Sequence, residues 1–192
     1  YGGRLAAHRL REISKMIILI AGASHTGKTL LASRLIEKYV YQGRVYSCLS
    51  LDLLKMGLIR SGNTALTPYD DEKLTPYLWS ISREIIRTAL ENNQNLIVEG
   101  CYIPFDFMND FTADQRDEIK YICLVMTRSY ILTHTDDITR FASVIEKRPD
   151  DTVDIPELIA DNERNLAECR ARGLGFILID KDYDVAQRTE EV

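Results

Sequence analysis

The sequence has no long apolar run. The longest one near its N-terminus spans residues 16–21, whereas a membrane-spanning helix needs about 18 apolar residues in succession. A short apolar run of this kind, followed by a glycine-rich turn, is typical of a buried strand. We therefore expect no membrane-embedded segment.

Cysteine pairs are also missing. The four cysteines, Cys48, Cys101, Cys123 and Cys169, include no CxxC pair, and their spacing suits neither a zinc site nor a disulfide framework. We interpret them as small hydrophobic residues in a reducing compartment, which predicts a cytoplasmic location.

An excess of basic charge is absent as well. There are 24 Lys and Arg against 29 Asp and Glu, a net charge of −5. Nucleic-acid binding usually requires a basic footprint, so we expect no nucleic-acid partner and favour a small-molecule ligand. Whether the chain is a monomer or a homodimer is left open.

Apolar runs alternate with helical patterns along the 192 residues. This alternation is typical of a parallel sheet with helices on both faces. We predict one α/β domain, with three layers and a five-stranded parallel sheet. Helices are expected at 28–41, 52–60, 75–92 and 156–173, with Pro76 as the first helical position of the third. The expected strands are 16–21, 44–49, 95–99, 119–126 and 176–180.

Two segments lie outside this regular pattern. Residues 1–15 form a basic lead-in, or a remnant ahead of a start at Met16, and we assign them no function. Residues 16–192 form the predicted domain. Its stretch at about 127–153 combines a helical piece with a charged turn, and we expect it to act as a small mobile lid.

A phosphate-binding loop follows the first predicted strand. The segment fits G-x-x-x-x-G-K-[ST], with a strand before it and a helix after it. Its glycines permit a tight turn whose N–H groups point at phosphates, and the helix dipole adds positive potential. This pattern predicts ATP binding. The predicted ligand-binding residues are Gly22, Ala23, Ser24, His25, Thr26, Gly27, Lys28, Thr29 and Leu30, with His25 acting through its backbone alone.

Two of these side chains carry a specific role. Lys28 would supply a cation to the β- and γ-phosphates, and the Thr29 hydroxyl would bind Mg²⁺. Glu99 ends the third predicted strand, which is apolar enough to be buried. A buried carboxylate needs a role or a partner, and we predict that Glu99 also serves Mg²⁺.

Acidic and aromatic residues follow the second and third strands. Residues just past the carboxyl ends of parallel strands line the ligand crevice. There Asp52 would orient or deprotonate an acceptor hydroxyl, or hold Mg²⁺ through water, although a helix N-cap is the alternative. Tyr102, Phe105 and Phe107 would form either an apolar acceptor wall or a loop packed on the core.

Arginines follow the fourth predicted strand. Phosphoryl transfer develops negative charge that a closing lid can stabilise, and Arg140 and Arg148 lie in the lid segment. Arg164, on the last helix, could face the same site, while a solvated surface charge is the alternative for each. The guanine-reading Asn-Lys-x-Asp is absent, which argues against a switch GTPase.

These features together resemble the small kinases of the adenylate kinase-like and nucleoside-monophosphate kinase group, and also 2-phosphoglycerate and zeta-toxin kinases. The resemblance covers most of residues 16–182 and implies the P-loop NTPase fold, with the strand order 2-3-1-4-5 for the predicted sheet. It implies ATP binding by Lys28 and Thr29, an acceptor-binding helix opened at Asp52-Leu53-Leu54-Lys55, and a lid arginine at Arg148, in Arg148-Pro149-Asp150-Asp151. The Phe-Pro-Arg that adenylate kinases carry after the third strand is replaced here by Tyr102-Ile103-Pro104, which puts AMP as the acceptor in doubt.

The sequence thus predicts an ATP- and Mg²⁺-dependent phosphotransferase that acts on a small acceptor, a nucleotide or a phosphorylated metabolite. Two other classes stay open. One is an ATP-binding regulatory switch with little turnover. The other is a polynucleotide or sugar-nucleotide kinase.

Overall fold

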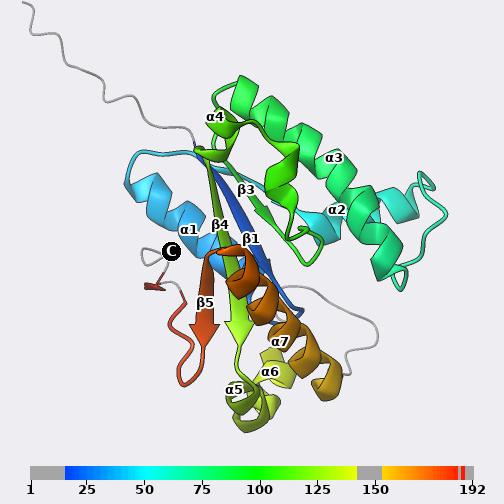
Figure 1. Cartoon of the computed structure of the whole chain (residues 1–192), viewed down its shortest axis with the longest axis vertical. Helices are drawn as coiled ribbons and strands as arrows, with labels where there is room; N and C mark the ends of the chain where they lie inside the picture. The colour runs from blue at the N-terminus through cyan, green and yellow to red at the C-terminus, as the bar shows by residue number, and fades with distance from the viewer. Residues whose placement is uncertain (1–15, 142–152, 186, 189–192) are drawn as a thin grey trace, which may run out of the picture.

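A parallel five-stranded sheet forms the centre of the molecule (Figure 1). The computed structural model describes residues 16–141, 153–185 and 187–188. The strand order is β2-β3-β1-β4-β5, and every neighbouring pair is parallel, which confirms the predicted fold class and topology. The strands are β1 (Ile17–Gly22), β2 (Ser47–Ser50), β3 (Leu96–Glu99), β4 (Ile119–Met126) and β5 (Phe176–Ile179).

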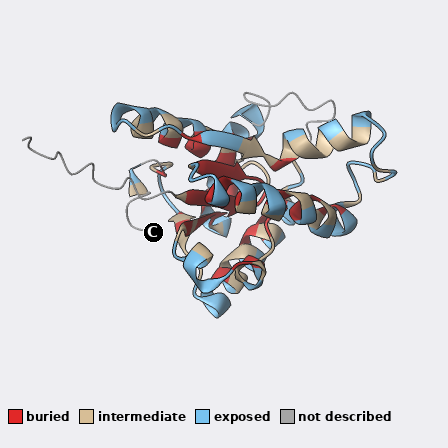
Figure 2. Ribbon diagram, turned by 90° about the horizontal axis from the view of Figure 1, so that it is seen from above, coloured by how far each residue is buried: buried red, intermediate tan, exposed pale blue. Residues whose placement is uncertain are grey.

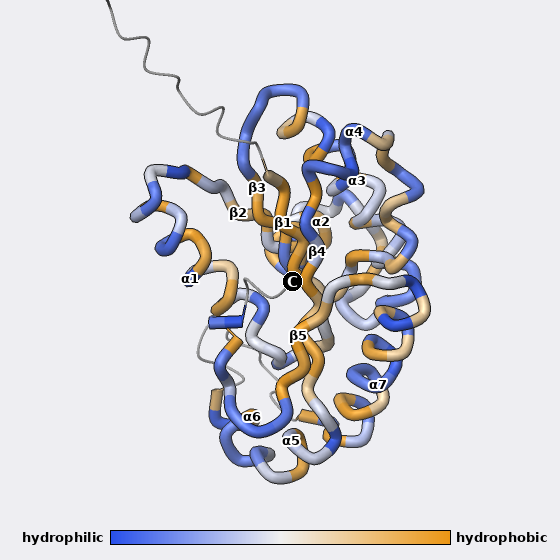
Figure 3. Tube along the Cα trace, turned by 60° about the vertical axis from the view of Figure 1, so that its left-hand side comes forward, coloured by the Kyte–Doolittle hydropathy of each residue, from blue (hydrophilic) through white to orange (hydrophobic). Residues whose placement is uncertain are grey.

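Helices cover both faces of this sheet, so that buried strands lie between exposed outer surfaces (Figure 2). The helix α1 lies against one face and α3 against the other (Figure 3). The helices are α1 (Lys28–Tyr41), α2 (Leu51–Arg60), α3 (Asp71–Glu91), α4 (Ala113–Arg116), α5 (Arg128–Thr133), α6 (Thr135–Phe141) and α7 (Ile155–Arg172), with a 3₁₀ turn at Phe107–Asp110.

The central strand β1 explains why the sheet is covered twice. Successive side chains of a strand point to opposite faces. Ile17 and Leu19 pack into the core beneath α3, while Ile18 and Ile20 pack into the core beneath α1. All six residues of β1 are buried. Fully burying one such side chain contributes about 1.5–3 kcal/mol, so both layers are needed to cover the strand.

The start of α3 corrects one sequence prediction. The helix begins at Asp71 and not at Thr75-Pro76, so Pro76 lies within the second turn. The Asp70 carboxylate accepts hydrogen bonds from the Thr67 N–H at 2.8 Å and the Thr67 hydroxyl at 2.7 Å, which orders the turn before the helix. Pro76 therefore lacks a hydrogen bond to the carbonyl four residues earlier, a cost that it would not have at the first helical position. The preference of proline for the first position of a helix therefore did not predict where α3 begins.

The last helix follows its sequence signals. The Asp154 side chain accepts a hydrogen bond from the Glu157 N–H at 2.9 Å, and Pro156 lies in the first turn, where its missing N–H costs nothing. Gly173 ends the helix with φ 65°, a left-handed conformation that favours glycine. These caps fix where α7 begins and ends beside β4.

The predicted lid is described only in part. Its first half forms α5 and α6, while residues 142–152, with Arg148, lie outside the described residues, as does the lead-in 1–15. No helix among the described residues is long and apolar enough to cross a membrane.

Candidate active site

The predicted phosphate loop joins β1 to α1 and is closed by its own side chains. Lys28 Nζ donates to the Ala23 carbonyl at 2.7 Å, and Thr26 Oγ1 donates to the same oxygen at 2.8 Å. His25 and Gly27 have φ of 62° and 81°. Turns that alternate between right- and left-handed backbone gather successive N–H groups around an anion. The loop therefore has the backbone form expected of a phosphate site. Leu30 follows it in the first turn of α1, half-buried.

A residue that the sequence analysis missed holds this loop from the far end of the chain. Tyr183, which follows β5, donates a hydrogen bond from its hydroxyl to the Thr26 carbonyl at 2.9 Å. A Cβ atom placed on Gly27 would lie 1.8 Å from that hydroxyl oxygen. Gly27 is thus required for close approach as well as for its backbone angle. No local pattern around Tyr183 indicates this contact.

Lys28 is buried among acidic groups. Burial lowers its pKa, but the acidic groups of Cys101, Asp52 and Glu99 together outweigh burial and leave the pKa raised. The ammonium group is therefore charged in the physiological range. Its position at the start of α1, among loop amides, is where a phosphate would need a cation.

Glu99 lies at the carboxyl end of β3, 1% exposed, beside Ser50 of β2 and Ile20 of β1. Its Oε2 accepts a hydrogen bond from Thr29 Oγ1 at 3.2 Å, but neither its Oε1 nor Ser50 Oγ makes a hydrogen bond of good geometry among the described residues. Burial raises the pKa of Glu99, against the opposing effects of the Ser50 hydroxyl and the Lys28 charge.

This environment fits a magnesium ion. An orphaned buried carboxylate oxygen beside a threonine hydroxyl is a costly arrangement unless a cation completes it. Mg²⁺ prefers one or two protein oxygens together with substrate phosphates and water. Glu99 and Thr29 supply such oxygens next to the phosphate loop.

Replacing Glu99 with Gln is expected to act on stability and function in opposite directions. Because the folded protein raises the Glu99 pKa, ionisation of Glu99 costs stability as pH rises through that value. The metal-free E99Q protein should therefore melt higher than wild type at pH 8, and the gain should vanish at pH 4. The Mg²⁺ concentration for half-maximal activity should rise about tenfold. Thermal unfolding with EDTA and a Mg²⁺ titration measure the two effects. An unchanged Mg²⁺ dependence would remove the metal role.

Asp52 is not a helix cap, which corrects that alternative. The N-cap of α2 is Ser50, and Asp52 lies in the first turn. Its Oδ1 pairs with Lys55 Nζ at 3.0 Å, and the same nitrogen donates to the Tyr102 hydroxyl at 2.7 Å. That hydroxyl donates in turn to Asp71 Oδ1 at 2.8 Å. A chain of hydrogen bonds thus fixes Asp52 near Lys28 and Glu99, both of whose pKa values its charge raises.

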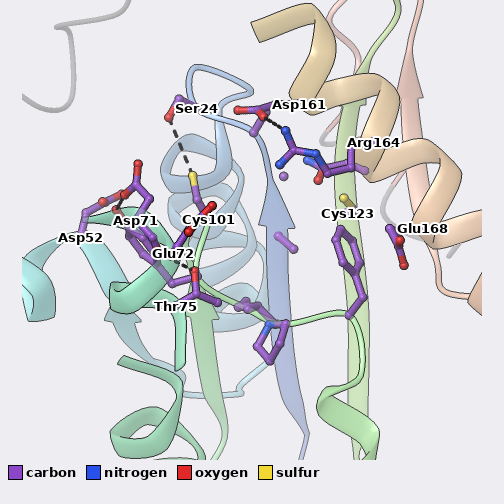
Figure 4. A pocket seen from close by; sticks show the side chains of 18 of the residues that line it. Ser24, Asp52, Asp71, Glu72, Thr75, Cys101, Cys123, Asp161, Arg164 and Glu168 are labelled. Carbon is purple, nitrogen blue, oxygen red and sulfur yellow. Dashed lines mark hydrogen bonds and ion pairs between the residues drawn. The ribbon is translucent and has the colours of Figure 1, made fainter. Parts of the chain in front are cut away.

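A cavity of about 730 Å³ opens beside the phosphate loop. Its walls are the loop, the first turns of α2 and α3, residues 101–106, part of β4 and one face of α7. Asp71, Glu72 and Thr75 of α3 lie on one side of it, opposite Asp161 and Arg164 of α7 (Figure 4). Its volume suits a small ligand.

The predicted arginines are placed differently from one another. Arg164 lines the cavity and pairs with Asp161 at 2.8 Å. Arg140 does not line it; its side chain is 70% exposed, pairs with Asp137 at 3.6 Å and lies over the Phe141 ring. Arg148 lies outside the described residues. The structure therefore brings Arg164, and not Arg140, to the cavity.

The aromatic loop divides between the two roles that its sequence left open. Phe107 is fully buried and stacks on Tyr121 in the core. Tyr102 and Phe105 line the cavity. The cysteines divide in the same way: Cys123 and Cys169 are buried as expected, whereas Cys48 and Cys101 are exposed. The Cys101 sulfur lies 3.9 Å from Ser24 Oγ of the phosphate loop.

Comparison with solved structures supports the fold. The chain is similar to the Deinococcus radiodurans tunicamycin resistance protein (17% identity, 92% of each chain covered, TM-score 0.52). It is also similar to a sugar kinase from Janibacter sp. (13% identity, 92% of this chain and 91% of that chain covered, TM-score 0.51). A third similar structure is a gluconokinase from Sinorhizobium meliloti (12% identity, 93% of this chain and 89% of that chain covered, TM-score 0.50). The chain therefore shares the fold of these three proteins, a parallel five-stranded sheet with helices on both faces. No protein-family model and no curated protein matches the sequence.

Proposed function

We propose that the protein is a kinase that transfers the γ-phosphoryl group of ATP, with Mg²⁺, to a hydroxyl group of a small molecule. The observation that carries this proposal is the grouping of Lys28, Asp52 and Glu99 at one end of the sheet, beside a cavity large enough for a second substrate. That two proteins of the same fold are a sugar kinase and a gluconokinase supports a hydroxyl acceptor.

Each residue of the site has its own role in the proposed reaction. The phosphate loop and Lys28 would bind the β- and γ-phosphates, and Tyr183 would hold the loop in shape. Bound Mg²⁺, held through Thr29 and Glu99, would neutralise charge on the phosphates. The oxygen of the acceptor hydroxyl would bond to the γ-phosphorus while the bond from that phosphorus to the β–γ bridging oxygen breaks. Asp52 would accept the proton that the acceptor hydroxyl loses.

The test is ATP consumption with Mg²⁺ across an acceptor panel: AMP and other nucleoside monophosphates, nucleosides, phosphoglycerates, sugars and amino sugars. A signal with one acceptor class that the Lys28→Ala variant loses is the expected result. If nothing in the panel is phosphorylated although calorimetry shows ATP binding, the regulatory-switch interpretation replaces this one. Salt-sensitive binding to oligonucleotides would favour the polynucleotide kinase alternative.

A further inference from the structure

The charge of the cavity beside the phosphate loop is strongly one-sided. Among the residues that the structure describes, its lining holds seven carboxylate side chains against three cations, an excess of four negative charges. This is much more acidic than the chain as a whole, which carries a net charge of −5 over 192 residues. A cleft lined by one sign of charge concentrates ligands of the opposite sign.

Each of the three cations in the lining pairs with a carboxylate of the same lining. Lys55 pairs with Asp52 at 3.0 Å, Arg164 with Asp161 at 2.8 Å, and Arg172 with Glu168 at 2.8 Å. Recognition of a phosphate or carboxylate usually needs an arginine or lysine that is free to face it. Here a ligand anion bound at any of these cations would lie beside the carboxylate that already pairs with it.

Three of the carboxylates, in contrast, make no ion pair with any cation in the part of the chain that the structure describes. Asp71 accepts a hydrogen bond from the Tyr102 hydroxyl at 2.8 Å and reaches Lys55 only through that hydroxyl. Glu72 on α3 and Glu157 on α7 make no ion pair among the residues that the structure describes. Asp71 and Glu72 face the cavity from the same turn of α3, close to the Lys55–Tyr102 hydrogen bonds that lead to Asp52 (Figure 4).

We infer that the acceptor is a hydroxyl compound that carries a protonated amine, an amino sugar or amino alcohol, whose ammonium group lies at Asp71 and Glu72. This inference rests on the proposed kinase function. Bound ATP and Mg²⁺ would add further negative charge to the site, which disfavours an anionic acceptor again. An acceptor of this class differs in charge from the nucleotide and phosphorylated-metabolite acceptors that the sequence favoured.

Sets of acceptors built on one carbon skeleton test the inference, because their members carry a positive, a neutral or a negative group. One set is glucosamine, glucose, gluconate and glucose 6-phosphate; another is serinol, glycerol, glycerate and glycerol 3-phosphate. In at least one set, we expect kcat/KM for the amine to be at least ten times that for the neutral compound. With the anionic compounds, we expect ATP consumption no greater than without an acceptor. A best acceptor that is neutral, carboxylated or phosphorylated overturns the inference and leaves the kinase function standing.

Binding separates this failure from a failure of the proposed function. Calorimetry on the protein loaded with a non-hydrolysable ATP analogue and Mg²⁺ should show tighter binding of glucosamine than of glucose, and none of gluconate. The preference should weaken in 0.5 M NaCl, because salt screens exposed charges. If the amine binds selectively but no acceptor is phosphorylated, the function fails and the charge inference stands. Equal binding of glucosamine and gluconate overturns the inference.

The double variant D71N/E72Q assigns the effect to these two carboxylates. The amide oxygen that D71N introduces can still accept the Tyr102 hydrogen bond, so the local structure is kept. The double variant should raise the KM for the amine acceptor about three- to tenfold, in line with two solvent-exposed charges, and should shift the KM of the neutral member less. Glu91→Gln, an exposed acid at the far end of the same helix, is the control. Equal changes for both acceptors would overturn the assignment.

Discussion

Replacing Lys28 with Met is expected to lower the kinase rate by at least about 10³-fold. The developing negative charge in phosphoryl transfer is stabilised by fixed cations and amides, and removing one such donor commonly costs 10²–10³ in rate. The loss of rate on replacing Lys28 should exceed that range, because its ammonium group is charged and is held by the loop carbonyl of Ala23 at 2.7 Å. The measurement is ATP consumption at saturating acceptor.

The control for this variant must separate charge from folding. Met keeps the length of the buried side chain but removes the Lys28 charge from beside the buried Glu99, so some loss of stability is expected. Thermal unfolding of K28M, with and without Mg²⁺, shows whether the protein still folds. Lys38→Met, in the last turn of the same helix, should retain near wild-type activity. A folded K28M protein that keeps more than a tenth of the rate would refute the assignment.

Asp52→Asn is expected to lower kcat about 10²- to 10³-fold while ATP binding changes by less than about threefold. General-base catalysis contributes roughly 10²–10⁴ in rate, and Asn cannot take up the proton. The amide oxygen can still accept the hydrogen bond from Lys55, so the chain of contacts through Tyr102 is retained. Rapid-quench turnover and ATP calorimetry measure the two quantities.

A Mg²⁺ titration decides between the two roles of Asp52. If Asp52 is the base, the loss of rate stays the same at every Mg²⁺ concentration. If it holds Mg²⁺ through water, excess Mg²⁺ restores much of the activity. Asp114→Asn, an exposed acid on α4 outside the cavity lining, should behave as wild type. Full turnover of D52N on the true acceptor would remove both roles.

The sequence by itself determined the sheet and the phosphate loop. Both depend on local patterns: buried parallel strands are apolar runs, and the loop is a contiguous segment in which glycines, Lys28 and Thr29 have fixed spacing. The position of Glu99 at the end of a buried strand also followed from a local pattern, because a carboxylate directly after an apolar run is unusual. The strand order followed from the alternation of strands and helices together with a resemblance to known kinases.

Only the tertiary structure decided how the cavity beside the phosphate loop is built. Tyr183 meets Thr26 across 157 residues of sequence, and no local pattern marks such a contact. The start of α3 at Asp71 depends on the turn before it, and this start places Asp71 and Glu72 in the cavity. On the other side of the cavity, α7 contributes charged residues of both signs, among them the paired Asp161 and Arg164. Which charges of a cavity are left unpaired depends on which cations and carboxylates meet in space. The sequence does not show this, because a paired arginine and an unpaired one are identical in sequence.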